Sequence, residues 1–167
     1  TARPVAEMIF ERLPATLELM AVSFLFAALI ALPLGIYSSI RQYSGFDMTA
    51  TTFSFLGMAM PVFWFALILQ LVFSVKLHWL PTSGRVTVGD ASAIDQIRHL
   101  ILPAFVLSIR NIASWSRYMR SSVLDIIRAD YIRTARSKGL AERVVLLRHA
   151  VRNAMIPVVS IMALDLA

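Results

Sequence analysis

The chain has 167 residues, of which 58% are hydrophobic, and its mean hydropathy is +0.71. Because ordinary soluble domains are about 45–50% apolar, this composition favours an integral membrane protein. The chain has no cysteine, which excludes disulfides, thiolate metal sites and cysteine nucleophiles. Its net charge is +6, and nine of its 16 Lys and Arg residues lie between positions 117 and 152.

The N-terminal stretch predicts a short amphipathic segment at residues 1–14, followed by a membrane-spanning helix at 15–40. Spaced apolar residues give the first segment one apolar face, typical of a helix lying on an interface, and a solvated linker is the alternative. The 22 residues from 19 to 40 carry no charge. As a helix they would extend about 33 Å, enough to cross a hydrocarbon core of about 30 Å.

A polar turn at 41–47 is predicted to lead into a second spanning helix at 48–77. The 28 residues from 48 to 75 are uncharged, enough to span a membrane with some tilt. Pro61 lies inside this run. Because proline lacks the backbone N–H and obstructs the preceding turn, it predicts a kink here.

The remaining predicted elements are, in order, a polar loop at 78–99, a third spanning helix at 100–120, a basic segment at 121–152 and the start of a truncated spanning helix at 153–167. The third apolar run is interrupted at Arg110, about 15 Å along the helix from Leu100. A charge at that depth faces a protein interior or a watery cavity, and it marks a functional position by default.

The basic segment is patterned as two short amphipathic helices joined at Gly139. Apolar residues recur at helical spacing on both sides of this glycine. In the second helix the apolar stripe consists of Leu140, Val144, Leu147 and Val151.

Loop charges predict the orientation in the membrane. Residues 117–152 carry nine basic and three acidic residues, whereas the 78–99 loop carries two arginines. The positive-inside bias therefore places the basic segment in the cytoplasm and the loop outside. The 41–47 turn is then cytoplasmic and the 1–14 segment external. Basic clusters also occur in proteins that bind nucleic acid or anionic lipid, but the flanking apolar runs favour the membrane interpretation, and we expect no nucleic-acid partner.

Motifs of common enzymes are not found. No glycine-rich loop ends in Gly-Lys-Ser/Thr, so the chain has no such device to hold ATP. His78, His99 and His149 have no partner at metal-ligand spacing. No nucleophile-elbow sequence carries a serine. We therefore expect no catalytic residue, no metal site and no cofactor bound by this chain.

The sequence DYIRTARSKGL at 130–140, followed by RHAVRNAMIP at 148–157, resembles the cytoplasmic loop of permease subunits of ATP-binding-cassette (ABC) importers. The closest resemblance is to the dipeptide/oligopeptide class. Arg133, Thr134 and Ala135, and then Gly139 after three further residues, occupy the places of the family's Glu-Ala-Ala…Gly motif.

The resemblance extends over nearly the whole chain. Where the general family continues with Ile-x-Leu-Pro, this chain has His149, Val151 and Arg152, a departure that resembles the peptide subclass. Four further stretches resemble that subclass: RPVAEMIFERLPATLEL at 3–19, PVFW at 61–64, LPTSGR at 80–85 and RHLILP at 98–103. The LPTSG sequence is similar to the first of its two permease types.

The resemblance implies an all-α integral membrane protein, a transmembrane helical bundle of the ABC importer permease type with a cytoplasmic coupling helix. It implies a multi-pass location in the bacterial cytoplasmic (inner) membrane. Family members have six spans, so we interpret the chain as a fragment with the second to fourth and the start of the fifth, lacking the first and last. The implied partners are a second homologous permease, two cytoplasmic ATPase subunits that hold ATP and Mg, an external solute-binding protein and membrane lipid.

The resemblance also implies which residues contact the ATPase. The expected ATPase-coupling residues are Arg133, Thr134, Ala135, Arg136, Lys138, Gly139 and Leu140. Small Ala135 and Gly139 would allow close approach of another protein, Leu140 would fill an apolar pocket, and Arg136 and Lys138 would pair with acidic groups. The alternative is that Gly139 only stops a helix and the arginines only set the topology.

A second set of candidates concerns the translocation path or a subunit interface: Pro61, Phe63, Trp64, Arg110, Asn111 and Asp165. Arg110 would either attract a peptide carboxylate or pair with Asp165 or a partner subunit. We favour pairing, because a buried unpaired charge is costly.

The predicted function is that of a permease subunit of a di/oligopeptide importer, which couples translocation to ATP hydrolysis on separate subunits. The first alternative is the same type of permease carrying nickel complexes, glutathione or another peptide-like solute. An ATP-independent channel or secondary transporter is a second alternative. A purely structural scaffold is the least favoured, since the loop motif would then have no task.

Overall fold

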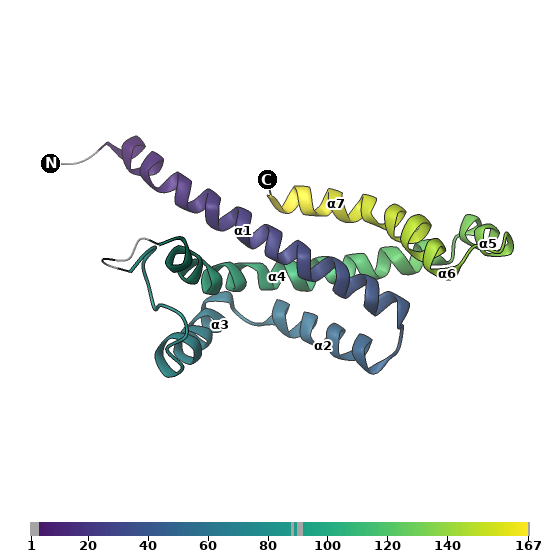
Figure 1. The fold of residues 1–167 in the computed structure, drawn as a ribbon, viewed down its shortest axis with the longest axis horizontal. Coiled ribbons are helices and arrows are strands. Elements are labelled where there is room, and N and C mark those ends of the chain that lie inside the picture. Colours follow the sequence, from purple (N-terminus) through teal and green to yellow (C-terminus); the bar gives the residue numbers. More distant parts are fainter. Residues whose placement is uncertain (1–3, 88, 90–91, 167) are drawn as a thin grey trace. The chain divides into compact units, whose positions relative to one another are not determined.

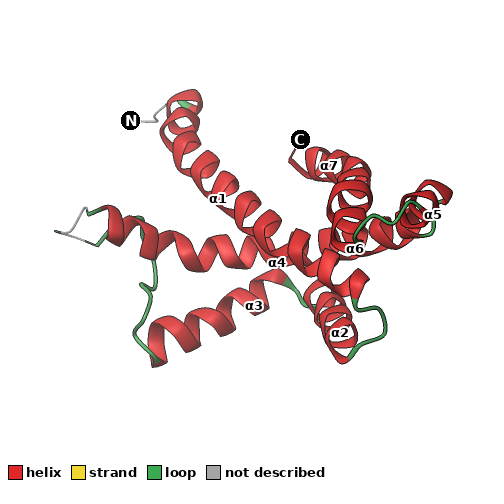
Figure 2. Ribbon diagram, turned by 45° about the vertical axis from the view of Figure 1, so that its right-hand side comes forward, coloured by secondary structure: helices red, strands yellow, loops and turns green. Residues whose placement is uncertain are grey.

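The structure, a computed structural model, describes residues 4–87, 89 and 92–166. It divides into two compact units: the first unit comprises residues 1–27 and 60–109, and the second unit comprises residues 28–59 and 110–167. Helices are the only extended regular elements in the described part of the chain (Figures 1 and 2). The predicted all-α fold class is therefore confirmed.

The helices have the following bounds: α1 (Val5–Ile40), α2 (Gly45–Ala59), α3 (Val62–Leu69), the π-helical η1 (Gln70–Lys76), α4 (Ala93–Ile127), α5 (Asp130–Ser137), α6 (Glu142–Val144), the π-helical η2 (Val145–Val151) and α7 (Arg152–Leu166). The predicted amphipathic segment at 1–14 and the predicted spanning helix at 15–40 are not separate elements, because α1 runs unbroken from Val5 through Pro14 to Ile40. Residues 1–3 and 167 of the predicted end segments lie outside the described residues.

The predicted kink at Pro61 is confirmed as a complete break between two helices. α2 ends at Ala59, and Pro61 precedes α3 with φ −61° and ψ 129°, an extended conformation. Proline also disfavours helical backbone in the residue before it. The 48–77 run is therefore a pair of helices rather than one continuous helix.

Two helical stretches in the described part of the chain are long and apolar enough to cross a membrane, Val5–Ile40 and Glu142–Leu166. The bent pair Gly45–Ala59 and Val62–Lys76 makes a third if it counts as one span. α4 is 35 residues long but is not among them. Its apolar run is interrupted by charged residues such as Arg110, so that part of α4 needs protein or water beside it rather than lipid alone.

In the first unit, aromatic rings connect three helices. The Phe105 ring of α4 lies 5.9 Å from that of Phe26 in α1 and 6.1 Å from that of Phe65 in α3. The loop that follows η1 is held by hydrogen bonds to η1 itself: the Gln70 side-chain amide donates to the Thr82 carbonyl over 2.6 Å, and the Ser74 hydroxyl donates to the Pro81 carbonyl over 3.1 Å.

In the second unit, the C-terminal half of α4 supplies the core. Its residues Trp115, Met119 and Val123 are completely buried. α1 passes close to this helix at Gly35, where an added Cβ would lie 2.5 Å from the Ser116 carbonyl oxygen and 2.7 Å from the Met119 Cβ. Only glycine permits this approach of the two helices.

Candidate functional site

The basic segment comprises the last residues of α4, followed by α5, α6 and η2. Ala129 has an extended backbone, and α5 starts at Asp130, whose carboxylate suits the positive end of a helix dipole. α5 stops at Ser137, and Gly139 follows with φ +78°. This left-handed conformation is strained for residues with a Cβ, and the two predicted helices do meet at Gly139, between the end of α5 and the start of α6.

A small apolar core holds the basic segment together. Ile132 of α5 and Val145 and Ala150 of η2 are completely buried. Ile126 and Ile127, at the end of α4, pack partly buried against this cluster. α5 is therefore not a free loop, because it is attached through side-chain packing to the end of α4 and to η2.

The apolar stripe predicted for the second helix is mostly exposed. Leu140, Val144 and Leu147 are exposed, and the buried positions are Val145 and Ala150. Within η2, π-helical hydrogen bonds join residues five apart rather than four, and the buried Val145 and Ala150 have this spacing. A spacing of three and four residues therefore does not identify the buried face of this segment.

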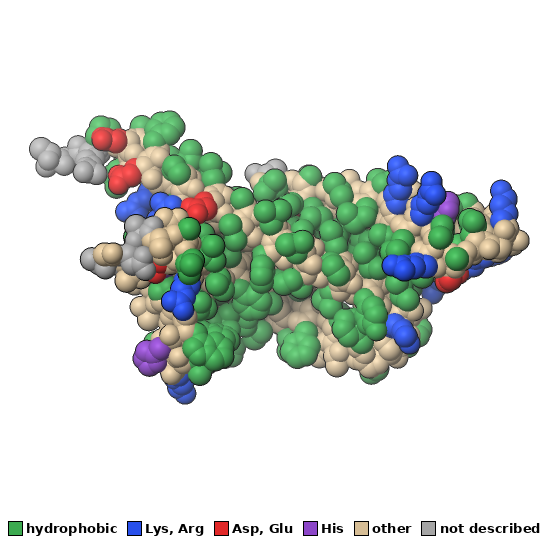
Figure 3. Space-filling view, viewed as in Figure 1, with side chains coloured by type: hydrophobic (Ala, Val, Ile, Leu, Met, Phe, Trp, Pro, Cys, Tyr) green, Lys and Arg blue, Asp and Glu red, His purple; other side chains and the backbone are tan. Residues whose placement is uncertain are grey.

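The expected coupling residues near Gly139 are exposed, with one exception. Arg133, Thr134, Arg136, Lys138, Gly139 and Leu140 are exposed, whereas Ala135 is half-buried and packs against the Ile132 cluster. Basic side chains gather over this end of the second unit, with apolar side chains among them (Figure 3). The space around Gly139 is open, since an added Cβ would meet nothing within 4 Å.

Arg136 already has a partner within the chain. Its guanidinium donates two hydrogen bonds to the Glu142 carboxylate, from Nε over 3.1 Å and from Nη2 over 2.7 Å. The pair spans the Gly139 turn and connects the end of α5 to the start of α6. The expectation that Arg136 pairs with acidic groups of another protein therefore needs a change of partner, whereas no ion pair in the described structure involves Lys138.

The basic segment is also joined to α7. The Asn153 side-chain amide donates to the Tyr131 hydroxyl over 3.1 Å, and the Ser122 hydroxyl of α4 donates to the Ala154 carbonyl over 2.9 Å. α4, α5 and α7 thus form one connected body within the second unit.

The candidate translocation residues fall into two groups. Pro61, Phe63 and Trp64 belong to the first unit, where all three are exposed and Phe63 is 70% accessible. Arg110 and Asn111 belong to the second unit, where Arg110 is exposed and Asn111 is half-buried.

The favoured pairing of Arg110 with Asp165 does not form within the chain. The Asp165 carboxylate instead accepts a hydrogen bond of 2.6 Å from the indole N–H of Trp115. The physical reason is that the Trp115 side chain is completely buried, and a buried N–H needs an acceptor. The alternative pairing of Arg110 with a partner subunit stays a prediction.

Sequence reasoning missed a buried ion pair in the second unit. Asp47, assigned to the polar turn, is only 3% exposed. Its carboxylate accepts hydrogen bonds from Arg120 Nε over 2.6 Å and Nη2 over 2.7 Å. The Tyr43 backbone N–H, over 2.9 Å, and the Ser38 hydroxyl also donate to it. The available signal was an isolated aspartate beside a long uncharged run, but nothing in the residue pattern indicates its partner.

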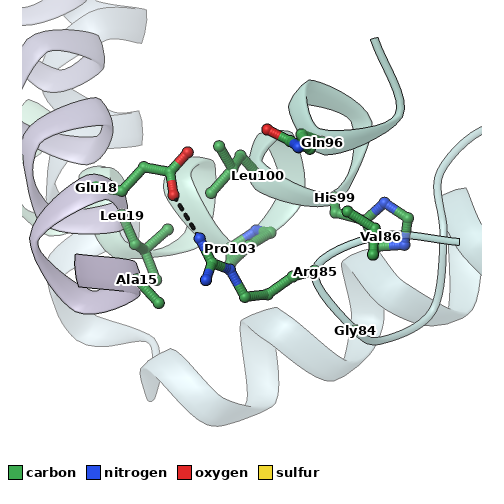
Figure 4. A pocket seen from close by; sticks show the side chains of 10 residues that line it. All are labelled: Ala15, Glu18, Leu19, Gly84, Arg85, Val86, Gln96, His99, Leu100 and Pro103. Carbon is green, nitrogen blue, oxygen red and sulfur yellow. Dashed lines mark hydrogen bonds and ion pairs between the residues drawn. The ribbon is translucent and has the colours of Figure 1, made fainter. Parts of the chain in front are cut away.

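The first unit contains a cavity of about 460 Å³ between α1, the 78–99 loop and α4 (Figure 4). Across it, Arg85 of the loop forms an ion pair of 2.8 Å with Glu18 of α1. Both side chains are well exposed, so the pair contributes little to stability. The pair connects the loop to α1.

Asp95 fastens the same loop to the start of α4. Its carboxylate accepts hydrogen bonds from the Thr87 backbone N–H over 2.6 Å and from the Thr87 hydroxyl over 2.7 Å. These two donors hold the pKa of the Asp95 carboxyl below its usual value. Among the described residues, no group of three or more potential ligands is arranged to hold a metal ion.

The apolar helices and the basic segment packed on them are features of an integral membrane protein. Residues 31–167 match the family described as binding-protein-dependent transport system inner membrane component, and the chain belongs to this family. The predicted resemblance to importer permeases is thereby confirmed.

Similar proteins carry peptide-transport names. The chain is 50% identical over 162 residues to the oligopeptide transport system permease protein AppB of Bacillus subtilis (strain 168), covering 96% of this chain and 51% of that protein. It is 40% identical over 171 residues to the di/tripeptide transport system permease protein DppB of Pseudomonas aeruginosa (strain UCBPP-PA14), covering 91% and 51%.

A third relative is the dipeptide transport system permease protein DppB of Escherichia coli (strain K12), 38% identical over 184 residues, with 97% of this chain and 54% of that protein covered. The chain thus spans about half the length of these relatives.

Proposed function

We propose that the protein is the transmembrane permease subunit of an ABC importer for dipeptides or oligopeptides, located in the bacterial cytoplasmic membrane. The observation that carries this proposal is the family match over residues 31–167, together with relatives named for peptide transport. A second permease, two ATPase subunits and an external solute-binding protein complete the proposed complex. ATP and Mg bind to the ATPase subunits rather than to this chain.

The proposed orientation places the basic segment in the cytoplasm and the 78–99 loop outside. Its support is the concentration of arginine and lysine in the basic segment. α4 then crosses the membrane among other helices. The burial of Trp115 and Met119 within the second unit supports this, because a helix surrounded by protein needs less apolar surface than one facing lipid.

The surface around Gly139 is the proposed contact with an ATPase subunit. It combines an exposed apolar side chain, Leu140, with the cations Arg133 and Lys138. The packing of α5 against α4 and η2 supports this role. Because α5 is packed against α4, a displacement of this surface by an ATPase subunit also displaces α4. In this proposal Ala135 supports the surface from inside.

Substitution of Gly139 by asparagine separates the docking role from that of a simple helix stop. Asparagine tolerates a positive φ, so the turn is retained, but its side chain fills the open space needed for close approach. We expect Gly139→Asn to lower the binding-protein-stimulated ATPase rate of the reconstituted full-length complex about tenfold, a loss of about 1.4 kcal/mol of coupling.

The matched control is Gly89→Asn, at a loop glycine with φ +92° and equally open surroundings. This variant should keep the stimulated rate. If Gly139→Asn also keeps it, Gly139 is only a helix stop. A parallel reconstitution omits the ATPase subunits. Uptake of labelled dipeptide that persists there would contradict the ABC mechanism and favour a channel or secondary transporter.

A further inference from the structure

Asp47 and Arg120 join segments that are far apart in the sequence. Asp47 lies in the first turn of α2, and Arg120 lies on α4, 73 positions later. The two hydrogen bonds from Arg120 come from different nitrogens of one guanidinium to the two oxygens of one carboxylate. Such a two-point contact fixes both distance and orientation, which a single point charge does not.

The same carboxylate also fixes the end of α1. The Ser38 hydroxyl of α1 donates to it, as does the backbone N–H of Tyr43 in the turn between α1 and α2. Tyr43 has φ +62°, an uncommon conformation for a residue with a side chain. Asp47 therefore holds the α1–α2 turn in one shape while it binds α4.

Two further contacts connect the same helices nearby. Gly35 of α1 rests directly on the α4 backbone at Ser116, within one helical turn of Arg120. The hydroxyls of Ser54 in α2 and Ser116 in α4 lie 3.4 Å apart. The ion pair is therefore one of several attachments of α1 and α2 to α4, and it is the only ion pair in the described part of the second unit that connects α2 to α4.

α4 continues from Arg120 to the basic segment without a flexible linker. The helix runs to Ile127, and Ile126 and Ile127 pack against the buried Ile132 of α5. A displacement of α5 thus reaches Arg120 through less than three turns of continuous helix, about 10 Å at 1.5 Å per residue.

We propose that Asp47 and Arg120 are positioning residues that make the α1–α2 turn and α2 move together with α4 and the basic segment. This inference rests on the proposed function, in which an ATPase displaces the basic segment. Without the ion pair, the remaining contacts between the helices, such as that of Ser54 with Ser116, would pass a smaller part of this displacement from α4 to α2. The pair thereby determines how much of each ATP-driven movement is converted into transport.

The first test is Arg120→Lys in the full-length complex reconstituted with its ATPase subunits and binding protein. Lysine keeps the charge but cannot make the two-point contact. We expect normal assembly, with uptake of labelled dipeptide per ATP hydrolysed reduced about fivefold, at the lower end of coupling between protein sites. Uptake per ATP equal to that of the unmodified complex would overturn the proposal.

The matched control is Arg117→Lys. Arg117 lies on the same helix, is exposed, and sits 4.5 Å from the Phe55 ring of α2 without an ion pair. This variant should keep uptake per ATP within about twofold, as expected for a surface substitution. An equal loss in both variants would show general sensitivity of α4 and would also overturn the proposal.

If the complex with Arg120→Lys does not assemble, a variant in which both partners are neutral still tests the proposal. The double variant Asp47→Asn/Arg120→Gln leaves no lone buried charge, so assembly should recover. Uptake per ATP should stay low, because the neutral amides hold the helices less firmly. Full recovery of both properties would show that the pair serves assembly alone.

A distance measurement tests the rigid connection without reference to transport. This chain has no native cysteine, so spin labels can be placed at Met48→Cys in α2 and Arg143→Cys in α6, both exposed. We expect one narrow distance distribution, unchanged by ATP, that broadens in Arg120→Lys. An unchanged distribution in that variant would contradict the inference. A complex that takes up no peptide with ATP but shows this broadening would contradict only the proposed function.

Discussion

At the scale of single residues, the structure assigns partners that composition and spacing leave open. Arg136 is exposed yet engaged with Glu142, and Asp165 is engaged with Trp115 rather than Arg110. Asp47, which resembles an ordinary turn residue in the sequence, is the most heavily bonded carboxylate described. In each case the partner is distant in sequence or lies across a turn, so only the fold brings the two side chains together.

Acid should loosen the loop held by Asp95. The Thr87 donors lower the pKa of this carboxyl in the folded state, so their contribution is complete above the usual pKa of about 4 and is lost as pH falls below it. We expect backbone amide exchange of the loop, corrected for intrinsic rates, to accelerate as the pH falls below about 4. The measurement is hydrogen exchange of the full-length protein in detergent.

The control for this prediction is Thr87→Val, which removes the hydroxyl donor but keeps the backbone N–H. This variant should show faster exchange of the loop already at neutral pH and a smaller further change in acid. A pH response equal to that of the unmodified protein would show that the Thr87 hydroxyl does not take part.

Loss of the Trp115 hydrogen bond should destabilise the protein. Trp115→Phe removes the indole N–H that donates a hydrogen bond to Asp165, and it leaves a space in the core of the second unit. We expect a loss of about 2 kcal/mol in the free energy of unfolding, measured with the full-length protein in detergent. Trp64→Phe, at an exposed position, should change it by less than about 0.5 kcal/mol. If both variants lower the free energy of unfolding equally, the role assigned to the indole N–H of Trp115 is contradicted.

At the scale of elements, two helices differ from the sequence-based expectation for local physical reasons. α1 absorbs the predicted amphipathic segment, because Pro14 does not interrupt the helix and no glycine occurs in it before Gly35. The 48–77 run breaks instead, because Pro61 follows Met60 at its centre. Proline position alone is not decisive, since α1 also passes through Pro14.

The close approach of α1 and α4 predicts a strong effect at Gly35. A Cβ there would overlap the Ser116 carbonyl and the Met119 side chain, so Gly35→Ala should force the helices apart. We expect a destabilisation of about 1–3 kcal/mol, measured as a lower unfolding temperature of the purified full-length protein.

Gly45→Ala provides the comparison for this prediction. Gly45 is also helical, and a Cβ there would meet nothing within 4 Å. Because alanine is the better helix former, this change should be neutral or slightly stabilising. A Gly35→Ala variant as stable as Gly45→Ala would show that the two helices do not approach as closely as described.

At the scale of the whole molecule, the second unit explains how a docking surface can act on distant helices. Its α4 contacts α1 through Gly35, α2 through Arg120 and α7 through Ser122. The basic segment at the end of α4 is packed onto the same body through Ile132. In the proposed transporter, α4 is therefore the element through which an ATPase subunit moves the rest of this unit.

The sequence by itself determined the helical membrane class, the transport family, the bend at Pro61 and the junction of two helices at Gly139. These features depend on the overall composition and on the backbone preferences of residues that are adjacent in the sequence. The tertiary structure alone decided that Asp47 binds Arg120, that Asp165 binds Trp115, and that Val145 rather than Val144 is buried. Those outcomes depend on which helix faces come together and on the π-helical geometry of η2, neither of which a periodic pattern in one chain specifies.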